Sequence, residues 1–257
     1  MTGRFDTLIE TATAIPTTQV RRYVDSVRRA HPDATPADLI VLLERRYLIA
    51  VSGSGGAVGA AAALPVVGTG VALALTAGQV GTFVAASAAL TLAVAEVHGI
   101  ATEDSARRRA LLLTTLLGEN GPELLEQQLG VSTATWAQVL LTRLPVATVK
   151  TVNKTLRGRM TKAVVAKGGS VMLGRLLPFG IGAVIGYAGG RLMGKNLIEG
   201  MHAAFGPAPA EFTRALESPI EVTEISAESE PNLFADAAQI ADRAAEHDRP
   251  ENERNLD

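Results

Sequence analysis

Hydrophobic residues recur at helical spacing along the first part of the chain. Residues 17–31 carry Tyr23 and three valines on one face of a helix and four arginines on the others. A second helix start follows, because Thr35 is a favourable N-cap and Pro36 suits the first helical position. The pattern therefore predicts that residues 1–46 form an N-terminal region of amphipathic helices.

The next stretch is apolar on every face. From Tyr47 to Ala95 the chain has 49 consecutive residues without a formal charge. The motif LPVVGTG at 64–70 is its natural break, so we expect two helices, at 38–64 and 71–97, that form an apolar hairpin. Only membrane helices or very deeply buried helices tolerate so long a stretch without charge.

Helical signals continue through the second half of the chain. Residues 103–117 begin with two acidic residues and are followed by a glycine, which is typical of an amphipathic helix. A short helix is expected at 122–129, and residues 132–167 read as helices broken near Pro145. No stretch before residue 219 alternates as a strand does. The predicted fold class is therefore all-α, a helical bundle with a Gly/Ala-rich apolar helical hairpin.

Four glycines in the last apolar segment share one helix face. Gly182, Gly186, Gly190 and Gly194 follow one another at intervals of four residues. A smooth glycine stripe lets a second helix approach closely in protein or in lipid, so we assign these four residues to helix packing. The uncharged segment 176–190, which contains the first three of these glycines, is too short to span a membrane by itself.

Charge separates the C-terminal region from the rest of the chain. Residues 1–210 hold 20 basic and 13 acidic residues, whereas residues 211–257 hold 4 basic and 13 acidic ones. This acidic tail also contains scattered Pro, Ser and Asn, so we expect most of it to be disordered. Residues 232–247 are the one piece able to form a short helix. We therefore divide the chain into the N-terminal helices, an apolar and basic helical domain at 47–210, and the acidic tail.

The middle of the chain is strongly basic. Between Glu126 and Glu199 there are ten basic residues and no acidic one. Anionic lipid headgroups would explain this bias, and an ordinary solvated helix face is the alternative. Nucleic acid is disfavoured, because no aromatic residue lies between Trp136 and Phe179 to stack on bases. We assign headgroup contact to Lys150, Lys154, Arg157, Arg159 and Lys162.

Basic residues also flank the apolar hairpin. Arg45 and Arg46 precede it, and Arg107, Arg108 and Arg109 follow it. This distribution is expected when a hairpin enters the membrane with both ends on the cytoplasmic side. The two helices are rich in Ala and Gly, so the free energy gained by inserting them is small. The first residues are acidic and lack the apolar core of a signal peptide, which favours an intracellular start.

Two segments resemble the EcsC protein family. The first, residues 78–118, reads GQVGTFVAASAALTLAVAEVHGIATEDSARRRALLLTTLLG, a helix followed by a short acidic link and an arginine-led helix. The second, residues 152–206, contains LPFGIGAVIGYAGG and the helix after it, although His98 in the first segment and Gly189–Gly190 in the second depart from the family pattern. The resemblance implies a bacterial, membrane-associated protein without an assigned reaction, and it supplies no catalytic residue.

No catalytic or metal-binding pattern is present in the sequence. The chain has no cysteine, which excludes disulfides, thiolate metal sites and cysteine nucleophiles. Glu96 and His98 are two residues apart and do not share a helix face, and Ser52 and Ser54 lack the G-x-S-x-G context. The Gly-rich strings follow no strand, so they match neither a P-loop nor a dinucleotide fingerprint. We expect no catalytic residue, cofactor or metal.

The sequence thus predicts a membrane-associated, non-enzymatic helical protein at the cytoplasmic side of the cell membrane. Its expected partners are anionic lipid and either a membrane protein or a second copy of the chain, with no nucleic acid. The alternative is a soluble Ala/Gly-rich helical bundle that binds a small or lipidic ligand, for which an enzymatic activity stays open.

Overall fold

The protein is built from helices throughout its described part. The computed structural model describes residues 2–62, 69–101, 103–118, 136–159 and 181–216, together with Leu233, Phe234, Asp236 and Gln239. These residues contain no strand, which confirms the predicted all-α fold. Residues 146–159 are helical. The other helices are α1 (Thr2–Thr13), α2 (Thr17–Ala30), α3 (Pro36–Ala62), α4 (Thr69–Val97), α5 (Ser105–Leu116), α7 (Trp136–Thr142) and α9 (Ile181–Phe205).

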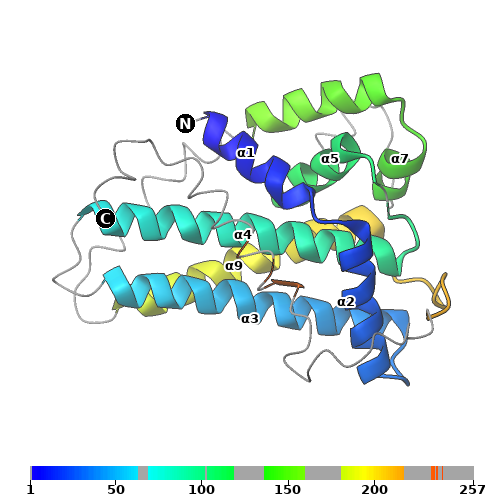
Figure 1. Ribbon diagram of the computed structural model, residues 1–257, viewed down its shortest axis with the longest axis horizontal. Helices are drawn as coiled ribbons and strands as arrows, with labels where there is room; N and C mark the ends of the chain where they lie inside the picture. Colours follow the sequence, from blue (N-terminus) through cyan, green and yellow to red (C-terminus); the bar gives the residue numbers. More distant parts are fainter. Residues whose placement is uncertain are drawn as a thin grey trace, which may run out of the picture.

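Three long helices, α3, α4 and α9, form the body of the molecule (Figure 1). α3 and α4 run antiparallel as a hairpin, and α9 packs most extensively against α3. The ends of α3 and α4 lie within about two residues of the boundaries expected from the sequence. α3 begins at a reciprocal cap, because the backbone N–H of Asp38 donates to Thr35 Oγ1 at 3.2 Å and the backbone N–H of Thr35 donates to Asp38 Oδ2 at 3.0 Å.

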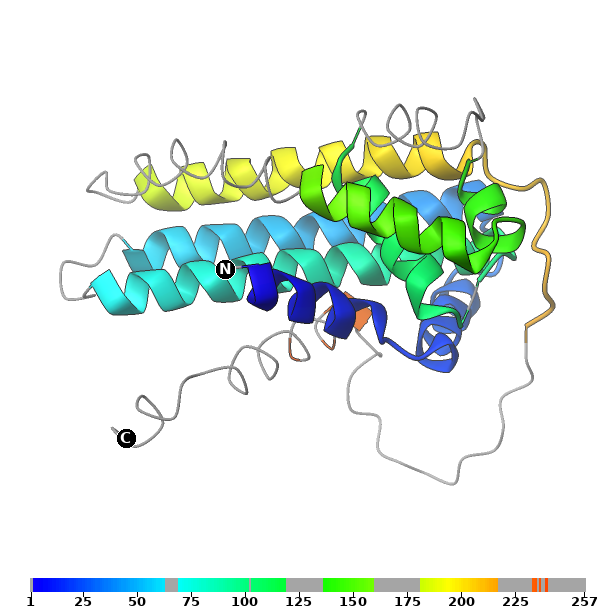
Figure 2. The ribbon, with the colours of Figure 1, turned by 90° about the horizontal axis from the view of Figure 1, so that it is seen from above.

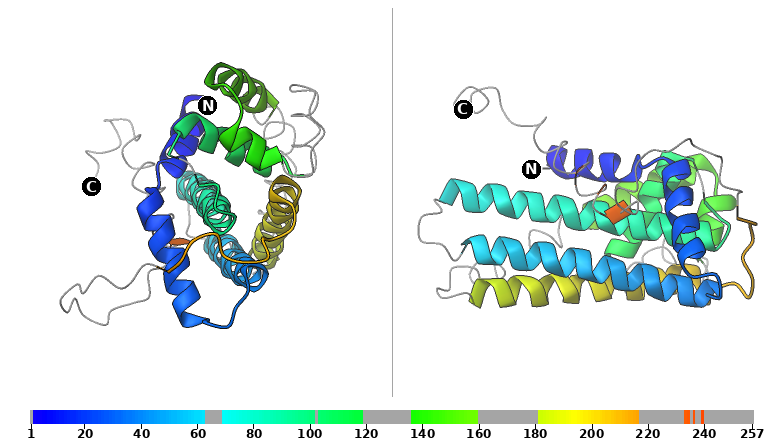
Figure 3. Two further views of the ribbon diagram at one scale, coloured as in Figure 1. Left: turned by 90° about the vertical axis from the view of Figure 1, so that its right-hand side faces the viewer. Right: turned by 60° about the horizontal axis from the view of Figure 1, so that its bottom comes forward.

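The shorter helices gather around one end of this body (Figures 2 and 3). α1 and α2 pack against α4, and α5 packs against α1, α4, α7 and α9. The other end, where α3 finishes and α4 and α9 begin, extends beyond these shorter helices (Figure 1). In its described part, the molecule therefore has a broad helical end and a narrower end formed by α3, α4 and α9.

Arg108 joins the start of the chain to α5. Its side chain is 5% exposed and donates to the carbonyl oxygens of Thr13 at 3.3 Å and Ile15 at 2.6 Å, and to the Thr17 hydroxyl. Carbonyls at a helix C-terminus lack partners within the helix, so a buried arginine there stabilises the junction between α1 and α2.

Arg107 plays the same part at the end of α7. Its guanidinium donates to the carbonyl oxygens of Leu140, Leu141 and Leu144, at 3.2 Å for Leu140 and 2.9 Å for Leu144. Arg107 and Arg108, which follow the apolar hairpin in the sequence, thus bind backbone carbonyls within the protein, and the membrane orientation inferred from this basic flank stays a prediction. Both side chains are used to hold helix ends inside the protein.

The acidic C-terminal region contributes two residues to the core. Leu233 and Phe234 are 1% and 3% exposed. The Phe234 ring lies edge-on to Tyr23, with 5.8 Å between centroids, and 6.2 Å from Tyr47. The described residues of the segment 232–247, for which the sequence allows a short helix, are helical, and they bridge α2 and α3.

Several sequence predictions concern residues outside the described part. These are the centre of the break at 64–70, the short helix at 122–129, the surroundings of Gly182, the position of Lys162, and the predicted disorder of most of the tail.

Candidate functional site

α3 and α9 approach each other along the predicted glycine stripe. A Cβ atom on Gly190 would lie 2.6 Å from the carbonyl oxygen of Val51, and one on Gly55 would collide with the carbonyl oxygen of Gly186. Real Cβ atoms do not come that close to a backbone, so this approach requires glycine. The structure places Gly186, Gly190 and Gly194 in the contact between the two helices, and Gly182 lies in the same helix.

Two further contacts set the register of the three long helices. A Cβ on Gly194 would lie 2.8 Å from Leu48 Cδ2 and 3.3 Å from Tyr47 Cε1. The Tyr47 hydroxyl and Ser87 Oγ are hydrogen-bonded at 3.0 Å, and both side chains are fully buried. Residues Tyr47, Ser87 and Gly194 therefore lie at about one level along the body.

One helical turn farther along, α9 is also free of formal charge, as α3 is from Tyr47 on and α4 is up to Ala95. We call this part the charge-free end and define it as residues 51–62 of α3, 69–83 of α4 and 181–190 of α9. At 1.5 Å per residue its α3 and α4 segments are about 18 and 22 Å long, which exceeds half of a hydrocarbon core of about 30 Å. Val80 and Tyr187 in this end are 47% and 48% exposed.

α4 contains the one described stretch that is long and apolar enough to cross a membrane by composition, Gly78–Val97. Most of that stretch is buried by the other helices. A core helix of a soluble protein has the same properties, so this stretch by itself favours neither location.

The helix at 146–159 presents the predicted headgroup residues to solvent. Val149, Val152 and Leu156 are buried. The opposite face is exposed and basic, and Asn153 Nδ2 donates to the carbonyl oxygen of Ala106 at 2.8 Å, which holds the helix on α5. The exposed basic residues are Lys150, Lys154, Arg157 and Arg159.

A groove of about 970 Å³ lies between this helix, α1 and α5. Its charged lining consists of Glu10 from α1, Arg109 from α5, and Lys150, Lys154 and Arg157. The Arg109 guanidinium lies 3.5 Å from the Glu10 carboxylate. Sequence reasoning missed Glu10 and Arg109, because nothing in their local pattern shows that three distant segments meet. We call this feature the basic groove.

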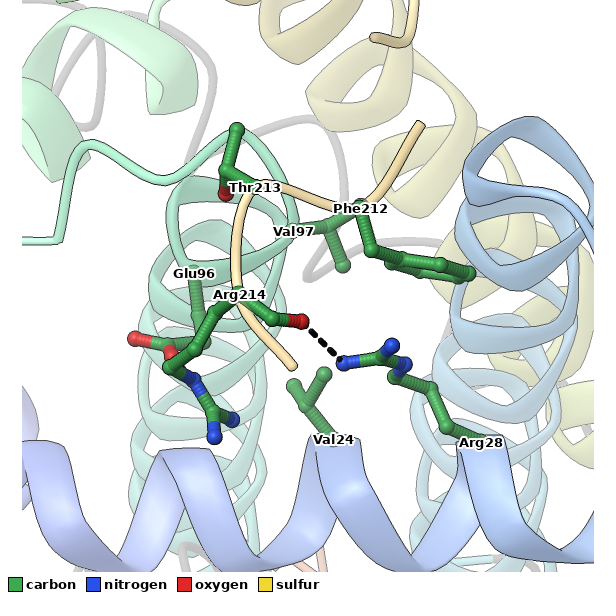
Figure 4. Close-up of a pocket in the computed structure, with 7 residues that line it drawn as sticks. All are labelled: Val24, Arg28, Glu96, Val97, Phe212, Thr213 and Arg214. Carbon is green, nitrogen blue, oxygen red and sulfur yellow. Dashed lines mark hydrogen bonds and ion pairs between the residues drawn. The ribbon is translucent and has the colours of Figure 1, made fainter. Parts of the chain in front are cut away.

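A second charged cluster lies at the broad end of the molecule (Figure 4). The Glu96 carboxylate is 3.1 Å from both Arg21 Nε and Arg214 Nε, and Arg214 Nη2 is 2.6 Å from Asp25 Oδ1. Asp25 and Glu96 are 2% and 8% exposed. Arg28 Nη1 donates to the carbonyl oxygen of Arg214 at 3.0 Å. The cluster fixes the segment after α9 to α2 and α4.

This cluster leaves no room for a ligand. The cavity among its side chains is about 10 Å³, close to the volume that one water occupies. His98 is also engaged elsewhere, since its ring stacks on Phe205 with 5.1 Å between centroids, and burial lowers its pKa. Among the described residues, no group of three or more His, Asp or Glu side chains could hold a metal ion.

Comparison with known proteins adds no assignment. No family model, curated protein or solved structure matches this chain. The similarity to the EcsC family therefore stays a prediction from the sequence, and the function is inferred from the charge-free end and the basic groove.

Proposed function

We propose that the protein is a membrane-associated, non-enzymatic helical protein that inserts its charge-free end into the bilayer. One observation carries this proposal: α3, α4 and α9 reach the same end of the molecule, and none of their residues there is charged. More than 80 residues separate the end of α4 from the start of α9 in the chain, so one local apolar stretch does not explain this. Charged residues are costly in hydrocarbon and ordinary on a soluble surface, so their joint absence favours lipid.

Basic residues stand where the charge-free end begins. Arg45 and Arg46 lie on α3 five to six residues before it, and Arg191 and Lys195 lie on α9 within the first five residues after it. Each basic residue near an anionic leaflet contributes about 1 kcal/mol to membrane association. This arrangement supports insertion from the cytoplasmic side of the cell membrane, with anionic lipid as the partner of the basic residues.

A protein of the EcsC type, as the sequence resemblance implies, fits this proposal. The competing function is a soluble bundle that binds a small or lipidic ligand, and the burial of Gly78–Val97 within the protein is equally compatible with it. The two functions differ in what surrounds the charge-free end.

Single-cysteine labelling distinguishes them, because the chain has no cysteine of its own. Val80→Cys and Tyr187→Cys place an environment-sensitive fluorophore on exposed positions of the charge-free end, and Asp33→Cys places it at the opposite end. On addition of vesicles that contain anionic lipid, we expect a blue-shifted emission at positions 80 and 187 and none at 33. Lipids brominated in their acyl chains should quench only the first two fluorophores.

The same experiment can overturn the proposal. Unchanged emission at all three positions, with the protein left behind when vesicles are floated on a density gradient, would contradict insertion. That result would favour the soluble bundle.

A further inference from the structure

The basic groove combines cations from two helices around one space. Lys150, Lys154 and Arg157 follow one another at intervals of four and three residues, so they form a single row along their helix. Arg109 faces the same space from α5, beside Glu10 of α1. Four cations and one carboxylate therefore line the groove, and the surplus of positive charge favours an anion.

The four cations differ in their ion pairs within the described part of the chain. Among the described residues, Lys150 and Lys154 form no ion pair. Arg109 is paired with Glu10, but the Glu10 side chain is 74% exposed. The Arg109 side chain is 19% exposed, so only the carboxylate of this pair is well solvated, and a phosphate of higher charge can replace that carboxylate at the Arg109 guanidinium.

We infer that the basic groove binds a phosphate ester through Arg109, Lys150, Lys154 and Arg157. Arginine matches two phosphate oxygens with its planar fork, and lysine adds a compact positive charge. A volume of about 970 Å³ is at the upper end for small-molecule sites, so the groove accommodates the phosphate with the group attached to it.

The same chemistry has two sources, a phospholipid headgroup and a free phosphate ester such as a polyol phosphate. The inference rests on the proposed function only where the source is lipid, since a free ester needs no membrane. The basic groove also differs from a general basic face, because Arg159 is exposed on the same helix but does not line it.

Arg159 supplies a matched control for the test. Lys154→Gln/Arg157→Gln removes two charges from the lining, and Arg143→Gln/Arg159→Gln removes two exposed charges outside it. All four side chains are exposed, so both double variants should fold, which circular dichroism and thermal melting can check. The full chain is titrated with glycerol 3-phosphate by calorimetry and tested for flotation with phosphatidylglycerol and phosphatidylcholine vesicles.

We expect the groove variant to bind at least one anionic probe about 10-fold or more weakly, which corresponds to a loss of about 1.4 kcal/mol or more in binding free energy. The control variant should change binding less than about twofold. Loss confined to phosphatidylglycerol vesicles assigns the site to lipid, and loss confined to glycerol 3-phosphate assigns it to a free ester. Equal weakening in both variants, or no binding of either probe by the unmodified chain, would overturn the inference.

Failure of this inference is separable from failure of the proposed function. The fluorophore at Tyr187→Cys reports insertion independently of the groove. A blue shift that persists in the groove variant, together with equal weakening in both double variants, would remove the phosphate site and retain membrane insertion.

Discussion

Two adjacent glycines in α9 have opposite surroundings. A Cβ on Gly190 would lie 2.6 Å from the carbonyl oxygen and 3.3 Å from the carbonyl carbon of Val51. A Cβ on Gly189 would meet nothing within 4 Å. Since backbone atoms of α3 cannot move aside as a flexible side chain can, one added methyl group separates the two helices at position 190 and not at 189.

Gly190→Ala should therefore lower the free energy of unfolding by about 1–3 kcal/mol, the usual cost of overpacking. Gly189→Ala should leave it unchanged or raise it by up to about 1 kcal/mol, because alanine favours a helix over glycine. Urea denaturation followed by circular dichroism measures both. Gly53→Ala on α3, which also meets open space, is a second control. Equal midpoints for the 189 and 190 variants would contradict the described packing.

The pair His202–Glu44 joins α9 to α3, with 2.5 Å between Nε2 and Oε1. The hydrogen bond to Glu44 raises the pKa of His202, and the nearby charge of Glu199 adds to the rise. The folded state then holds this proton more tightly than the unfolded state does. The stabilisation is complete below the unfolded pKa of about 6.5 and is lost as pH rises through the higher folded pKa.

Glu44→Gln should remove this pH-dependent contribution. The difference in melting temperature between the unmodified chain and the variant should be larger at about pH 6 than at about pH 8. His202 is 58% exposed, so the effect amounts to at most about 1 kcal/mol. The lowered pKa of His98 makes the folding stability rise with pH, which is the opposite of the effect of His202. Both proteins contain His98, so its effect cancels in the difference between their melting temperatures. A difference independent of pH would argue against the pair.

At the scale of elements, the sequence predicts helices better than it predicts their partners. The hairpin helices were recognisable because charge is absent over 49 residues and LPVVGTG interrupts them. The glycine stripe was recognisable because its spacing is periodic. The contacts of Arg107 and Arg108 could not be predicted, because the carbonyls that they bind lie at the ends of α1 and α7, whose positions in space no local pattern gives.

The basic groove illustrates the same limit. Its lysines were assigned from their charge and helical spacing, but Arg109 and Glu10 come from two other helices. The burial of Leu233 and Phe234 could not be predicted for a different reason, since two apolar residues hardly change the average composition of an acidic segment. Their role depends on Tyr23 and Tyr47, about 190 residues or more earlier in the chain.

Phe234 should therefore behave as a core residue although it lies in the acidic region. Phe234→Ala should lower the free energy of unfolding by about 3–5 kcal/mol, the usual cost of removing a buried aromatic ring. Gln239→Ala, at an exposed described position of the same segment, should change it by less than about 0.5 kcal/mol. Thermal and urea unfolding of the two variants test this, and comparable stability of both would show that Phe234 does not hold α2 and α3 together.

At the scale of the whole molecule, charge is unevenly distributed. Residues 127–198 carry ten basic residues, whereas residues 217–257 carry 12 acidic and 3 basic ones. Both regions belong to one chain, so their effective concentration for each other is high. We hypothesise that the acidic region competes with anionic lipid for the basic residues and weakens membrane binding.

Deleting the acidic region would be a poor test, because it would also remove two core side chains. Replacing the glutamates that precede Leu233 by glutamine keeps the core contact. Binding to anionic vesicles should tighten at low salt, binding to neutral vesicles should stay constant, and the difference should fade as salt screens the charges. Identical binding to anionic vesicles before and after replacement would refute the competition. The residues to replace are Glu217, Glu221, Glu224, Glu228 and Glu230.

The contact of Phe234 with Tyr47 also sets an order of events during synthesis. The hairpin is complete once Val97 has been added, and 137 more residues follow up to Phe234, which takes about 7 to 27 s at about 5 to 20 residues per second. Throughout that interval the hairpin exists without the ring that closes the core around it, and α9 is available only for the last part. Under the proposed membrane insertion, a nascent hairpin would meet the bilayer in this period, so we expect translation speed between Val97 and Phe234 to govern how many chains insert before the core closes.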